Sequence, residues 1–82
     1  MRERQVESFS EPAVLWRLQR GRDEARATVI PGSPVSTLVF LVNDELDRGE
    51  NYDALDAMLA RAEEVRRELL EQGWRPVEPG PD

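Results

Sequence analysis

Four arginines and one tryptophan lie close together near the start of the chain, and these residue types can bind nucleic acid. The arginines are Arg17, Arg20, Arg22 and Arg26, and Trp16 precedes them. Guanidinium groups bind phosphates, and an aromatic ring can stack on a base. However, Asp23 and Glu24 interrupt the cluster, and Trp16 shares the alternation of the apolar Val14 and Leu18, which favours a buried ring. A nucleic-acid-binding hairpin is therefore one hypothesis, and the net charge of −6 argues against it.

Acidic residues between positions 44 and 56 form the second group that could do chemistry, with a local charge of −5. Counted from Asn43, the run partly fits a calcium-binding loop, but Arg48 stands where that loop needs glycine and no glutamate ends it. We therefore expect no metal site and interpret the run as a solvated edge. The same acidity would also suit an acidic decoy or inhibitor that docks on a basic protein, and this alternative stays open.

The composition excludes most catalytic chemistry. The chain has no Cys and no His, and all 11 of its basic residues are Arg. Thiolate and imidazole ligands, a histidine base and a lysine nucleophile are therefore absent. The five glycines are scattered and form no phosphate-binding loop. Since roughly 60 ordered residues can hardly enclose a substrate cleft, we expect no enzyme, with no catalytic, cofactor-binding or metal residues.

A chain of 82 residues has room for one small domain. We expect a flexible N-terminal segment over 1–12, a single domain over 13–75 and a disordered Pro-rich tail over 76–82. The charges of the first seven residues alternate, unlike a signal peptide. The longest apolar run, 38–42, is far shorter than the roughly 20 residues that cross a bilayer. We therefore expect a cytoplasmic protein without membrane contact.

Three segments have the composition and alternation of strands. Residues 13–20 and 24–30 alternate apolar and polar positions around a turn at 21–23, which predicts a hairpin. The small Ala25 and Ala27 leave room for Trp16. Residues 36–42 are rich in β-formers and uncharged. Asn43 and Asp44 suit a two-residue turn, after which 45–52 is either a fourth edge strand or an irregular loop.

From Asp53 onward the apolar period changes to that of a helix, with Asp53 as the predicted N-cap. One apolar stripe runs along this helix: Leu55, Met58, Leu59, Ala62, Val65 and Leu69. Gly73 is suited to a left-handed helix end, where Trp74 can fold back onto Leu69 or Leu70. The helix is expected to stop before Pro76.

These elements predict a two-layer α+β domain, in which an antiparallel three- or four-stranded meander sheet is followed by one C-terminal helix packed on one face. We expect the helix stripe to contact five residues of the strands: Trp16, Leu18, Val29, Leu38 and Phe40.

One helix cannot cover both faces of such a sheet, and the strand 36–42 is apolar on both. Val39 and Leu41 should point away from the helix, and Leu15 and Ile30 should join them. An apolar patch of this kind often marks an interface. We expect either self-association, most simply as a homodimer, or a small protein partner there. In the alternative, the N-terminal segment folds over the patch with Val6 and Phe9.

Several phrases of the chain resemble a set of short bacterial proteins whose function is not established. Those proteins have a W-R-L-x-R-G opening, an L-V-[DN]-[GD]-E-L hairpin and a helix ending in G-W. The matching phrases here are Val14–Gly21, Glu24–Ala27, Leu38–Leu46, and Ala62–Glu64 with Gly73–Trp74. The likeness covers about residues 14–74 and implies a folded domain that stands alone. It implies no activity and no site residues.

Overall fold

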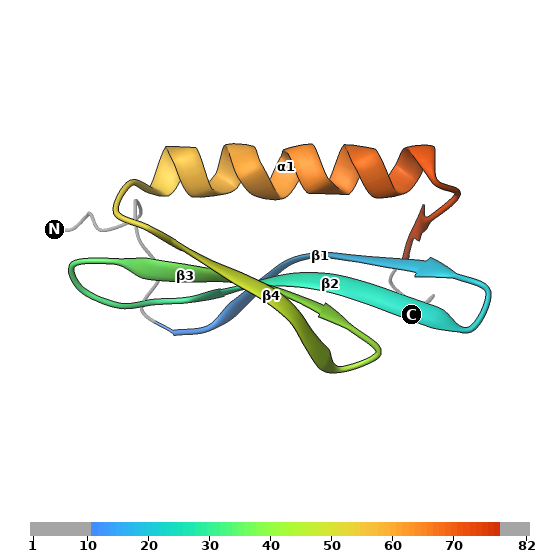
Figure 1. Ribbon diagram of the computed structural model, residues 1–82, viewed down its shortest axis with the longest axis horizontal. Coiled ribbons are helices and arrows are strands. Elements are labelled where there is room, and N and C mark those ends of the chain that lie inside the picture. Colours follow the sequence, from blue (N-terminus) through green and yellow to red (C-terminus); the bar gives the residue numbers. More distant parts are fainter. Residues whose placement is uncertain (1–10, 78–82) are drawn as a thin grey trace, which may run out of the picture.

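The computed structural model of the protein describes residues 11–77. Its described part forms two layers, an antiparallel sheet and one helix that lies across a single face of it (Figure 1). The elements are β1 (Ala13–Arg20), β2 (Asp23–Ile30), β3 (Ser36–Val42), β4 (Glu45–Tyr52), α1 (Leu55–Glu71) and β5 (Arg75–Pro76). The predicted α+β class is confirmed. Residues 1–10 and 78–82, most of the two segments expected to be loose, lie outside the described residues.

The sheet has the order β4-β3-β2-β1-β5, and every neighbouring pair is antiparallel. The turn between β3 and β4 consists of Asn43 and Asp44, whose φ angles are 54° and 67°. Positive φ at both residues is what a two-residue hairpin turn needs, and Asn and Asp tolerate it better than most side chains. Residues 45–52 form a strand, so the loop alternative is wrong.

The short strand β5 was not predicted. Arg75 and Pro76 pair with Gln19 and Leu18, and the amide of Val77 donates a hydrogen bond of 3.1 Å to the carbonyl of Arg17. A proline within a charged, Pro-rich stretch indicates the end of ordered structure. Pro76 is nevertheless compatible with β5, because β5 is an edge strand. The N–H that proline lacks is not needed on the outer side of an edge strand, where no further strand pairs.

The core lies between the sheet and α1. Its main cluster consists of Ala27, Val29, Leu38, Phe40, Met58, Ala62 and Val65, and a smaller one of Leu18, Ala25 and Trp74. The predicted stripe is correct for most of its members, but Leu59 is 39% exposed. Leu59 adjoins the fully buried Met58 on the helix and lies at the flank of the stripe, beyond the area that the sheet covers.

A bulge in β1 changes the predicted orientation of Leu15. The pairing with β2 shifts between Val14 and Trp16, so that Leu15 has no partner of its own in the register. A bulge of this kind breaks the strict alternation of a strand. Leu15 and Trp16 therefore both pack against the main core cluster. The expectation that Leu15 joins the face away from the helix is wrong.

The C-terminal end of α1 follows from local sequence, whereas its beginning differs from the prediction by one residue. The N-cap position is Ala54 rather than Asp53, and no side chain caps it. At the other end Gly73 has a φ of 99°, and its amide donates to the carbonyl of Leu70 at 3.1 Å. The amide of Trp74 donates to the carbonyl of Leu69 at 3.0 Å. This pair of bonds is a Schellman ending, as predicted.

Candidate functional site

No element within residues 11–77 covers the side of the sheet opposite α1 (Figure 1). That side carries a group of side chains that are apolar except for Thr28. We call it the open sheet face. It consists of Val14, Thr28, Ile30, Val39, Leu41 and Leu46. Val14, Ile30 and Leu46 are 47%, 42% and 67% exposed, whereas Val39 and Leu41 are half-buried. Three of the four residues predicted to form an interface thus lie together here.

The strand register arranges the open sheet face in rows that cross the sheet. Val39 lies opposite Thr28, which lies opposite Val14. On the other side of Val39 the register places Gly49, so that β4 adds no side chain to this row. In the next row Leu46 is opposite Leu41, because a bulge in β4 shifts the pairing by one residue. Apolar side chains of this face thus come from all four long strands, with Thr28 between Val39 and Val14.

Charged residues border this surface on the side of the two hairpin turns. Leu41 is followed in its row by Arg26 and then by Arg17. Arg26 forms an ion pair with Asp44 of the β3–β4 turn. Glu24 lies two residues from Arg26 on the same face of β2. The open sheet face therefore has an apolar centre with both signs of charge at one margin.

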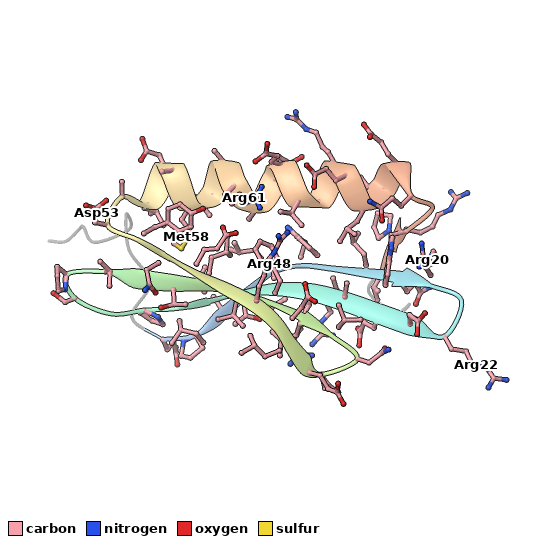
Figure 2. The ribbon with its side chains drawn as sticks, in the orientation of Figure 1. Arg20, Arg22, Arg48, Asp53, Met58 and Arg61 are labelled. Atoms are coloured by element: carbon pink, nitrogen blue, oxygen red, sulfur yellow. The ribbon has the colours of Figure 1, made fainter. Side chains whose placement is uncertain are left out.

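The four arginines of the first hairpin do not converge on one surface. Arg17 and Arg26 lie on the side of the open sheet face, whereas Arg20 lies on the helix side and Arg22 points away from the turn (Figure 2). The guanidinium of Arg20 lies 4.8 Å from the centre of the Trp74 ring and donates to the carbonyl of Gln72 at 3.1 Å. These contacts bind Arg20 to the C-terminal end of the helix.

Trp16 is not placed to stack on a base. Its indole Nε1 donates a hydrogen bond of 2.9 Å to the carbonyl of Ala62 in α1. Its ring packs beside that of Phe40, with 6.1 Å between the centres and 39° between the planes. The ring thus packs with the core on the side of Leu18, as predicted, whereas the bulge places Val14 on the opposite face of β1.

Part of the acidic segment is engaged in ion pairs. The carboxylate of Glu50 accepts a bond from Arg61 Nε at 3.1 Å, another from Arg61 Nη2 at 3.3 Å and a third from the Tyr52 hydroxyl at 2.8 Å. These bonds, the one from Arg61 foremost, lower the pKa of Glu50. The hydrogen bond that Tyr52 donates to Glu50 raises the pKa of the phenol. This network fastens β4 to α1, and the sequence analysis did not identify it.

A pocket of about 90 Å³ opens between α1 and the β3–β4 hairpin. Its apolar walls are Trp16, Ala25, Phe40, Val65, Leu69 and Trp74. Three residues of the hairpin, Val42, Asp47 and Arg48, are exposed and form its rim. The guanidinium of Arg48 lies 5.2 Å from the centre of the Phe40 ring. The pocket could not be found in the sequence, since it depends on where the helix and the twisted sheet diverge.

Two further observations concern the described residues as a whole. No helix within residues 11–77 is long and apolar enough to span a membrane. In the same range, no three acidic side chains come together as metal ligands would.

No protein-family model matches the chain, and comparisons with curated proteins and with solved structures find no match either.

Proposed function

We propose that the protein is a small, non-catalytic interaction module that self-associates through the open sheet face. The observation that carries this proposal is the apolar surface opposite α1, where Val39 and Leu41 are flanked by the exposed Val14, Ile30 and Leu46. Apolar side chains gathered on one face of a small domain are typical of an interface. Two such faces can pack against each other in the manner of a β-sandwich.

The charges at the margin support a second copy of this chain as the partner. A twofold interface uses the same patch on both subunits, so the patch must be complementary to itself. The open sheet face has apolar residues in its centre and carries Arg17, Arg26, Glu24 and Asp44 at its border. An apolar centre with a polar rim of both signs meets that requirement. A patch with one sign of charge would instead repel its own copy.

Association through the sheet edge is less favourable than association through its face. The outer strand β4 carries Glu45, Asp47, Arg48 and Glu50, and its pairing with β3 is interrupted by a bulge. Charges and bulges are the features by which edge strands avoid pairing with other chains. The β4 edge therefore disfavours pairing with a partner, which agrees with association through the face.

Charge substitutions on the open sheet face test the proposal. Val39→Glu and Leu46→Glu should convert a dimer of the full chain to a monomer, as measured by sedimentation velocity, with an unchanged circular dichroism spectrum. Leu46 is 67% exposed, so its replacement leaves the core intact. Leu59→Glu is the matched control, because Leu59 is an exposed leucine in the opposite layer, 39% exposed. A control variant that dissociates as readily as the other two would contradict the proposal.

We also propose that the protein is cytoplasmic, and cell fractionation tests this. The nucleic-acid and acidic-decoy alternatives have less support, because Arg20 and Arg26 on one side and Asp44 and Glu50 on the other are already engaged within the domain.

A further inference from the structure

We propose that the pocket between α1 and the β3–β4 hairpin binds a small molecule with a flat apolar body and an anionic end, such as an aromatic carboxylate. Although Leu41 and Arg26 contribute to both surfaces, this site lies between the helix and the sheet, whereas the proposed self-association uses the opposite side of the sheet. The inference therefore does not depend on self-association.

The pocket follows from the shape of the two layers. A sheet twists, and a straight helix can follow it over only part of its area. In Figure 1 the hairpin of β3 and β4 turns away from α1 at its tip, while β1 remains closer to the helix. The bulge in β4 beside Asp47 increases the local twist. Ala25, on the floor of the pocket, is too small to fill the gap that results.

The size and the walls of the pocket define the apolar part of the ligand. A volume of about 90 Å³ is well below the 300 Å³ or more of typical drug-sized sites, so the ligand has room for about one ring. Trp16, Phe40 and Trp74 supply aromatic walls. Aromatic side chains favour a flat ring, which can pack against their faces and edges.

The rim defines the charge of the ligand. Arg48 lies on the helix side of β4 (Figure 2), and its guanidinium is above the Phe40 ring. Within residues 11–77 it forms no ion pair, whereas Arg26, which also lines the pocket, is paired with Asp44. Asp47 is the acidic residue of the rim and favours a ligand whose anionic group lies on the side of Arg48. A carboxylate at the open end of the pocket would accept hydrogen bonds from that guanidinium.

The two tryptophans of the chain both line this pocket, so their indole N–H signals in a nitrogen-15 NMR spectrum report on its occupancy. The probe is 3-phenylpropionate, and 3-phenylpropanol is its uncharged counterpart. We expect 3-phenylpropionate to shift both indole signals of the full chain with saturation and a Kd at or below about 1 mM. No saturable shift would overturn the proposal.

Two variants locate the bound probe. Arg48→Gln should weaken 3-phenylpropionate about fivefold and leave 3-phenylpropanol unchanged, since a partly exposed ion pair contributes a factor of that order. Arg67→Gln is the matched control, because the side chain of Arg67 is 72% exposed on α1. Ala25→Val should abolish binding of both probes by filling the pocket.

Each outcome of these binding measurements either supports or overturns the proposal. Unchanged binding in a folded Ala25→Val variant would place the probe elsewhere and overturn the proposal. If that variant does not fold, Arg48→Gln decides alone, because its exposed side chain can be changed without disturbing the core. Equal affinity of Arg48→Gln and wild type for 3-phenylpropionate would then contradict the proposal. The oligomeric state is measured separately, so failure of the pocket and failure of self-association cannot be confused.

Discussion

Arg61 in the middle of α1 holds the carboxylate of Glu50 in the edge strand β4 through two nitrogens, Nε at 3.1 Å and Nη2 at 3.3 Å. The same guanidinium donates a bond of 2.9 Å to Glu64 one turn further along the helix. Each partner of the Arg61–Glu50 pair is 26% exposed, so solvent screens the pair only in part. The contact connects the edge of the sheet to the layer above it.

The Arg61–Glu50 ion pair predicts that the stability of the fold depends on pH. Because the folded state lowers the pKa of Glu50, the carboxylate stabilises the fold above its ordinary value of 4.5, and this contribution is lost as the pH falls through the lowered pKa. Thermal unfolding of wild type and Glu50→Gln should therefore differ most near neutral pH and converge at low pH. Glu68→Gln, on the exposed side of α1, is the control. Parallel curves for wild type and Glu50→Gln would contradict this role of Glu50.

Tyr52 offers a direct measurement of the same network, because the chain has a single tyrosine. Its hydroxyl donates to Glu50, which raises the pKa of the phenol above its ordinary 10.0. The neutral phenol therefore stabilises the fold below pH 10, and this contribution is lost as the pH rises through the raised pKa. Absorbance titration of the phenolate should show a midpoint above 10. In Glu50→Gln the midpoint should move back toward 10, and an unchanged midpoint would show that Glu50 is not its cause.

Met58 and Leu59 form a matched pair of neighbours that tests how α1 is oriented. Met58 is 1% exposed in the main core cluster, and Leu59 is 39% exposed. Met58→Ala should lower the free energy of unfolding by about 2–5 kcal/mol, through lost burial and the cavity that remains. Leu59→Ala should cost no more than about 1 kcal/mol. Urea denaturation measures both, and equal losses would mean that the helix is rotated relative to this description.

A side chain at Gly73 should destabilise the fold, although space is available there. A Cβ at this position would come no closer than 3.8 Å to the side chain of Arg20, but the φ of 99° strains any residue except glycine. Gly73→Ala should therefore cost about 1–2 kcal/mol. Gly49→Ala is the control, since its φ is not positive and its Cβ would make an ordinary contact of 3.6 Å with Thr37. A larger loss of stability for Gly49→Ala would contradict the assigned conformations.

Local sequence was enough to predict much of the fold. The strand periods, the turn at Asn43 and Asp44, and the Schellman ending at Gly73 depend on residues that are near one another in the chain. The α+β class follows from these elements in their order. The strand 45–52 was only one of two alternatives, because its charged composition is also typical of a loop.

The predictions that were wrong share one cause: each feature depends on contacts between distant parts of the chain. The bulge that turns Leu15 toward the core depends on how β1 pairs with β2. The exposure of Leu59 depends on how the helix crosses the sheet. Likewise, β5 forms because Trp74 is buried beside Leu18 and brings the next residues to the edge of β1. A periodicity in one segment contains none of this information.

The candidate site was partly predictable for the same reason. Alternation along 36–42 is sufficient to place Val39 and Leu41 away from the helix, and the structure brings Ile30 beside them with Val14 and Leu46. The ion pair between Glu50 and Arg61 and the pocket beside Arg48 involve strands and helix together. They emerge only from the arrangement of the two layers.

The central claim, self-association through the open sheet face, is tested most directly by the molar mass of the untagged full chain in solution. Light scattering coupled to size-exclusion chromatography measures this mass over a series of protein concentrations. The account predicts a mass of twice 9.4 kDa that falls toward 9.4 kDa on dilution. A mass of 9.4 kDa at every concentration would contradict it.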